Sequence, residues 1–159
     1  MSVTDTPSWL AKRLEDEGHR VLEFFHALAD YQWQKEVYSE ENGWTVYHIM
    51  AHLVSAEIGI ARLVQNVVAG GPGSPDDFDL DGYNQRKVRD LQGISVQDLM
   101  DRFSKARQEN SEMVARFTPT DMQRTGRHPW LGITSVGEMV KLLYRHNQIH
   151  LRDIRRALD

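Results

Sequence analysis

The stretch that decides the fold is SVGEMVKLLYRHNQIHLRDIRRALD, residues 135–159. At about 100° per residue its apolar side chains fall on one face, which is the pattern of an amphipathic helix. Ser135 and Glu138 stand at the spacing of a capping box, so the helix is expected to begin there. The apolar face also carries His146 and His150, which are one helical turn apart. The stretch therefore predicts a long helix that turns two imidazoles toward the rest of the protein.

Three other segments have the same helical periodicity. We expect helices over residues 7–29, from the N-cap Thr45 to about 68, and from the N-cap Ser95 to about 117, with a short helix around 83–91. The segments 69–80 and 118–134 are rich in turn-forming residues and are predicted to be loops without strands. Four amphipathic helices predict an all-α four-helix bundle that forms one domain over residues 1–159. The two interior connections are longer than an up-and-down bundle needs, which either a crossover topology or loops covering a site would explain.

Composition excludes several classes of protein. The chain has 159 residues and no cysteine, so disulfide scaffolds, cysteine-based metal sites and a cysteine nucleophile are all excluded. Its net charge of −4 argues against nucleic-acid binding, which requires a basic surface. No apolar run approaches the roughly 20 residues of a membrane span, and the N-terminal sequence MSVTDTPSW has no signal pattern. We therefore expect a soluble, cytoplasmic protein with neither a membrane nor a nucleic acid as partner.

The two inward histidines have two interpretations. Each could be a core residue satisfied by its own hydrogen bond, or the pair could share a metal ion, because spacing i, i+4 brings both imidazoles to one point. A metal ion needs at least one further ligand. On the helix after Thr45, His52 lies at the edge of the apolar face, whereas His48 lies closer to solvent. His52 is therefore the better third ligand, and His48 is expected to be exposed or to support a ligand.

Glu57 is a second anomaly, because it projects from the middle of an apolar face. It could form an ion pair with an inward arginine or lysine, or it could orient a ligand histidine or contact substrate. No catalytic residue is clearly identified. Glu57, His48 and Tyr83 are the candidates for proton transfer, and Trp130 could form a wall of the pocket.

Several short motifs together resemble the DinB-like superfamily. They are Trp44-Thr45-Val46, His52-Leu53, Gly132-Ile133-Thr134-Ser135-Val136 and His146-xxx-His150. This superfamily includes proteins described as metal-dependent hydrolases and is related to the N-terminal domain of mycothiol-dependent maleylpyruvate isomerase. The resemblance implies a crossover four-helix bundle, often a homodimer. It also implies a divalent metal, zinc or nickel, held by His52, His146 and His150.

The function predicted from residues and resemblance together is that of a metal-dependent enzyme acting on a small molecule. It would activate water, as a hydrolase, or a low-molecular-weight thiol, as a transferase or isomerase. The resemblance makes bacillithiol or mycothiol the expected thiol co-substrate. The alternatives are a stress-response protein that binds a metal or ligand without turnover, and a purely structural bundle.

Overall fold

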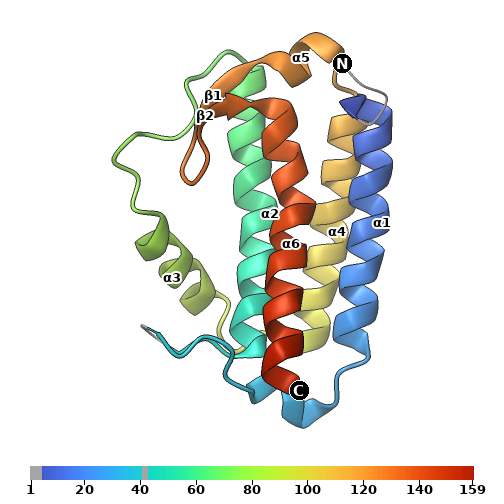
Figure 1. The fold of residues 1–159 in the computed structure, drawn as a ribbon, viewed down its shortest axis with the longest axis vertical. Coiled ribbons are helices and arrows are strands. Elements are labelled where there is room, and N and C mark those ends of the chain that lie inside the picture. Colours follow the sequence, from blue (N-terminus) through green and yellow to red (C-terminus); the bar gives the residue numbers. More distant parts are fainter. Residues whose placement is uncertain (1–4, 41–42) are drawn as a thin grey trace.

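The computed structural model describes residues 5–40 and 43–159, and four long helices dominate it (Figure 1). Their bounds are Pro7–His26 (α1), Val46–Val68 (α2), Val96–Ala115 (α4) and Val136–Leu158 (α6). A hydroxyl accepts a backbone N–H of the first turn in each helix, from Thr6, Thr45, Ser95 and Ser135. The predicted all-α four-helix bundle is confirmed, although α1 ends three residues before the predicted boundary.

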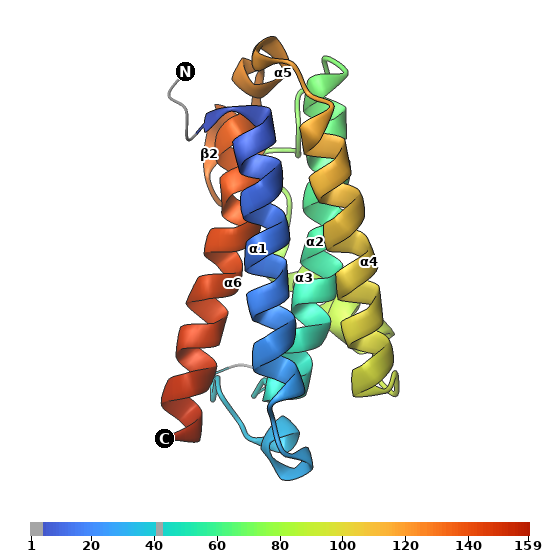
Figure 2. The ribbon, with the colours of Figure 1, turned by 90° about the vertical axis from the view of Figure 1, so that its right-hand side faces the viewer.

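The helices are connected across the bundle rather than around it. α1 packs against α4 and α6, and α2 packs against the same two helices. α1 and α6 run in one direction, whereas α2 and α4 run in the other (Figure 1, Figure 2). The chain therefore crosses a diagonal between α1 and α2 and again between α4 and α6. This is the crossover topology that the resemblance implied.

The first two connections lie at the end and on the side of the bundle. A 3-10 turn, Asp30–Gln34 (η2), follows α1, and its Trp33 stacks on Phe25 with ring centroids 5.4 Å apart. The second connection contains α3, Leu80–Asp90, which lies beside α2. This helix was predicted, but it begins three residues earlier because Asp79 caps it, accepting the N–H of Gly82.

The third connection corrects the prediction of a strandless loop over residues 118–134. It contains a short helix, α5, and a two-stranded antiparallel hairpin. Their bounds are Pro119–Gln123 (α5), Thr125–His128 (β1) and Gly132–Ser135 (β2). The strands are too short to show an alternating pattern, and contacts distant in sequence hold them. Arg127 N donates to Pro72 O at 2.9 Å, and Ser74 N donates to Arg127 O at 2.8 Å. Tertiary hydrogen bonds therefore fix the hairpin, and local propensity alone could not predict it.

The core is divided by a buried polar layer. One apolar cluster fills the end of the bundle near η2, and another fills the end near α5. Between them Arg107 of α4 donates from Nε to Glu57 of α2 at 2.9 Å and from Nη2 to Asn147 of α6 at 2.5 Å. Asn110 Nδ2 donates to the second Glu57 carboxylate oxygen at 2.8 Å. α1 contributes Gly18, where a Cβ would lie 2.7 Å from the Arg107 side chain, so the missing side chain makes room for the arginine.

None of the helices in the described ranges is long and apolar enough to cross a membrane. Residues 1–4 at the N-terminus, which were part of the search for a signal pattern, lie outside the described residues. A homodimer and a cytoplasmic location stay predictions.

Candidate metal centre

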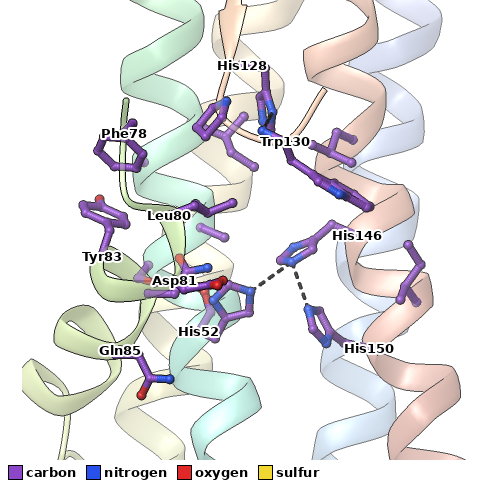
Figure 3. Close-up of a pocket in the computed structure, with 18 of the residues that line it drawn as sticks. His52, Phe78, Leu80, Asp81, Tyr83, Gln85, His128, Trp130, His146 and His150 are labelled. Carbon is purple, nitrogen blue, oxygen red and sulfur yellow. Dashed lines mark hydrogen bonds between the residues drawn. The ribbon is translucent and has the colours of Figure 1, made fainter. Parts of the chain in front are cut away.

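Three histidines from two facing helices meet beside the polar layer. His52 comes from α2, whereas His146 and His150 come from α6. The Nε2 atom of His146 lies 2.9 Å from the Nε2 atoms of both other histidines (Figure 3). One nitrogen from each residue lies within 4.8 Å of the others. These are the three residues that helical phasing brought forward as ligands.

Hydrogen bonding alone does not satisfy this cluster. An imidazole nitrogen carries either one proton or one lone pair, so the two 2.9 Å contacts of His146 Nε2 must share it and each is weakened. The Nδ1 atoms of His52 and His146 are buried and have no partner within the described part of the chain. Nitrogens that bind one tetrahedral zinc ion at about 2.0–2.1 Å lie about 3.3 Å apart, a few tenths of an ångström more than the 2.9 Å contacts seen here. Three converging imidazoles therefore fit a divalent cation.

Burial keeps the three imidazoles neutral. It lowers the pKa of His52 to about 3 and that of His150 to about 4. Burial, and then the proximity of the other two histidines, holds the pKa of His146 well below its usual value. A metal ion binds the neutral ring, so the cluster is in its ligating form without first losing protons at neutral pH.

A hydrogen-bonded chain orients one of the three. The hydroxyl of Tyr38 donates to Asp153 Oδ2 at 2.6 Å and lies 2.8 Å from His150 Nδ1. Burial and the bond to Asp153 raise the pKa of Tyr38, so its proton stays in place. The hydroxyl oxygen is then an acceptor toward His150, which must carry its proton on Nδ1 and present the Nε2 lone pair to the cluster.

A cavity of about 1020 Å³ opens beside the cluster. All three histidines line it, together with residues of α3, the segment after η2 and the hairpin (Figure 3). Much of its wall is apolar or aromatic, including Trp44, Phe78, Leu80, Leu142 and Ile149. This is a concave, mainly apolar site with a few convergent polar groups, as expected for a small-molecule pocket.

The match to a family model covers residues 13–154 and is described as the DinB superfamily. The chain belongs to the DinB superfamily. No curated protein matches its sequence.

Two solved structures share the fold of this DinB-superfamily chain. One is YfiT from Bacillus subtilis, described as a probable metal-dependent hydrolase with an unusual four-helix bundle topology. It superposes with a TM-score of 0.79 at 14% identity, over 99% of this chain and 88% of its own. The other is an uncharacterised protein from Escherichia coli UTI89, with a TM-score of 0.72 at 13% identity, over 96% of this chain and 92% of its own. At sequence identities this low, the structural similarity establishes the fold alone.

The three candidates for proton transfer in this DinB-superfamily protein lie in three different places. Glu57 makes the ion pair with an inward arginine, Arg107, that was one of its two interpretations, and it does not line the cavity. His48 is also outside the cavity, and its Nδ1 accepts the backbone N–H of Thr45 at 3.0 Å, so it caps α2. Tyr83 does line the cavity, from α3. Trp130 lines it too, with 60% of its surface exposed.

Sequence reasoning missed Tyr38, Asp153 and His128. Asp153 stands three residues after His150 on the same helix, which is a detectable spacing for a supporting carboxylate. Tyr38 lies in the connection after η2, where no periodicity predicts its direction. His128 lies at the end of β1, a strand that was itself not predicted.

Proposed function

We propose that this DinB-superfamily protein is a metal-dependent enzyme acting on a small molecule that binds in the cavity. His52, His146 and His150 would hold a divalent cation, zinc or nickel. The observation that carries the proposal is the convergence of three neutral Nε2 atoms on one point at the wall of a large cavity. The two Nε2 contacts of His146 also support it, because they compete for one proton or lone pair and a shared cation would replace both.

The three-histidine set leaves coordination positions free, which is characteristic of catalytic rather than structural sites. When bound, such a cation lowers the pKa of water or holds a thiol as its thiolate. The residues of the chain would supply position and environment. Tyr38 and Asp153 orient His150, while Trp44 packs against His52 with ring centroids 5.1 Å apart. The apolar wall excludes water from the part of the substrate that it covers.

Hydrolysis is the activity that we place first. In the thiol-dependent version, the sulfur would have to arrive with a co-substrate such as bacillithiol or mycothiol, because the chain has no cysteine. Binding of a metal or ligand without turnover is the competing function. A binding protein of this kind would use the same three-histidine centre, but it would catalyse no reaction there.

The test begins with metal content. Protein purified without a histidine tag, loaded with zinc or nickel and dialysed, should retain about one ion per chain. His146→Ala should abolish this binding, whereas His48→Ala should preserve it, because His48 is outside the cluster. Less than about a tenth of an equivalent in the unmodified protein, with no further loss in His146→Ala, would refute the metal centre.

Turnover is then measured on the metal-loaded protein. Aryl esters and amides test the hydrolase, and bacillithiol or mycothiol with a model electrophile tests the transferase. Activity that disappears in His146→Ala supports an enzyme. A metal-loaded protein that turns over neither class supports the binding function instead.

A further inference from the structure

His128 is held in the cavity wall by the backbone of its own hairpin. Its Nδ1 atom accepts the N–H of Trp130 at 3.0 Å and the N–H of Leu131 at 3.2 Å. A backbone N–H can only donate, so both contacts require a lone pair on Nδ1. The proton of the neutral ring must therefore be on Nε2. His128 thus has a defined tautomer, in contrast to most histidines of structures without visible hydrogens.

The ring is neutral and directed to the cavity. His128 is 6% exposed and lines the same cavity as the three-histidine cluster (Figure 3). Burial lowers its pKa to about 4, so it does not titrate near neutral pH. Its proximity to His146 also contributes, after burial and the other two histidines, to the lowered pKa of that residue. In the described part of the chain, the side chain of His128 makes hydrogen bonds at Nδ1 alone, and Nε2 makes none.

This tautomer excludes two roles. Nε2 carries the proton and has no lone pair to offer, so His128 is not a fourth ligand. A general acid would have to be cationic, which burial and the two N–H contacts at Nδ1 both oppose. The remaining chemistry is that of a fixed, uncharged donor, pre-organised by the hairpin.

Building on the function proposed above, we propose that His128 Nε2 donates a hydrogen bond to an acyl oxygen of the substrate beside the cluster. The substrate class that this predicts is an acyl compound, such as an ester, whose apolar body packs on the aromatic and aliphatic wall. The wall supplies Phe78, Leu80, Leu142 and Ile149 for that body.

The step that His128 would assist is hydrolysis of the acyl compound, which needs water as its only other reactant. The oxygen of water bonds to the acyl carbon while the π pair of the carbonyl moves onto the oxygen that faces Nε2. The electron pair on that oxygen then re-forms the carbonyl as the bond to the leaving group breaks. The leaving group keeps the pair of the broken bond and takes the proton that the water released. Donors placed where such negative charge develops are among the largest single contributions to catalysis.

A matched pair of substitutions separates this role from a purely structural one. His128→Asn keeps an oxygen where Nδ1 accepts the two N–H groups, as in an Asx turn, but cannot reach the cavity. His128→Gln has an amide N–H that reaches the position of Nε2. His19→Asn, on the exposed side of α1, is the control.

The probe is 4-phenylbutyrate, an acyl product with an apolar body and acceptor oxygens. It is titrated calorimetrically into metal-loaded protein. We expect His128→Asn to weaken binding by about tenfold or more, as for a hydrogen bond to a charged group, and His128→Gln to restore much of it. ¹⁵N NMR of the imidazoles should show His128 protonated on Nε2 alone across neutral pH.

Each failure has a different meaning. A protein that binds no metal refutes the function proposed above. A protein that binds metal but not 4-phenylbutyrate refutes the acyl substrate class. If metal and probe both bind and His128→Asn matches His19→Asn, or if NMR finds the proton on Nδ1, the donor role is wrong while the metal centre stands.

Discussion

Replacing Tyr38 with phenylalanine should weaken metal binding without disturbing the fold. The substitution removes a single oxygen atom and keeps the ring. That oxygen joins two groups, since it donates to Asp153 Oδ2 at 2.6 Å and lies 2.8 Å from His150 Nδ1. Without it, the Nδ1 proton of His150 loses its acceptor and the ring loses the bond that selects its tautomer and orientation.

The magnitude follows from the bonds that are lost. A hydrogen bond is worth about 0.5–1.5 kcal/mol, and a bond that involves a charged group about 1.5–3 kcal/mol. The contact at His150 is neutral, but Tyr38 couples it to the Asp153 carboxylate, so we take about 2 kcal/mol. This corresponds to a loss of about 30-fold in affinity, within the 10- to 100-fold usual for groups that support a metal ligand.

The assay is a competition titration of zinc between the metal-free protein and a chromophoric chelator at fixed pH. Tyr31→Phe is the matched control, because Tyr31 is 80% exposed and should not affect binding. Asp153→Asn should weaken affinity in the same direction as Tyr38→Phe. If Tyr38→Phe binds zinc within about twofold of the unmodified protein while His150→Ala does not bind, the chain from Asp153 to His150 does not support the ligand.

Three further predictions concern stability, each followed by urea unfolding. Glu57→Gln should lower the free energy of unfolding by about 3–5 kcal/mol, because it leaves the Arg107 charge buried without its partner. Asp16→Asn, which breaks an exposed ion pair, should change it little. Equal effects of the two substitutions would contradict the buried pairing. Gly73→Ala should lower the free energy of unfolding by about 1–3 kcal/mol, because φ is +88° and a Cβ would lie 2.4 Å from the Arg127 carbonyl oxygen. An unchanged stability would contradict the close packing of Gly73 against β1. The metal-free protein should lose stability as pH falls from about 6.5 toward 4. The unfolded chain binds protons in this range, whereas the buried histidines of the folded protein stay neutral because their pKa values are lowered. At pH 5 each deeply buried ring should lower the free energy of unfolding by about 2 kcal/mol. Identical unfolding at pH 7.5 and pH 5 would show that these rings are solvated.

The helices and the three clustered histidines could be predicted because one physical rule governs both. A buried face repeats every 3.6 residues, so a polar residue on that face is visible in the sequence as an exception. His146, His150 and Glu57 are such exceptions, and each makes a polar contact that is buried at Glu57 and partly buried at the two histidines. The rule identifies a buried polar residue, but it does not predict which residue on another helix that side chain contacts. Glu57 therefore had two interpretations until the position of Arg107 on α4 was known.

The connections could not be predicted in the same way, although they carry two residues of the proposed site. Tyr38 follows η2, and His128 ends a strand that is held by hydrogen bonds to residues 72 and 74. Their directions depend on contacts between segments more than 50 residues apart in sequence, as in the bond from Ser74 N to Arg127 O. No local pattern encodes such contacts. The functional parts of the pocket are thus less predictable than the scaffold that carries them.

The division of the core explains why a metal site fits at this level of the bundle. Apolar clusters on both sides of the polar layer bury side chains from all four long helices. Arg107, Glu57 and the two asparagines satisfy one another within the layer, so the helices remain connected there by their own hydrogen bonds. The histidines occupy the side of the layer that opens to the cavity, between the two apolar clusters. A cation bound there would add stability only by mass action, and its affinity could be set by the chemistry of the site rather than by the demands of folding.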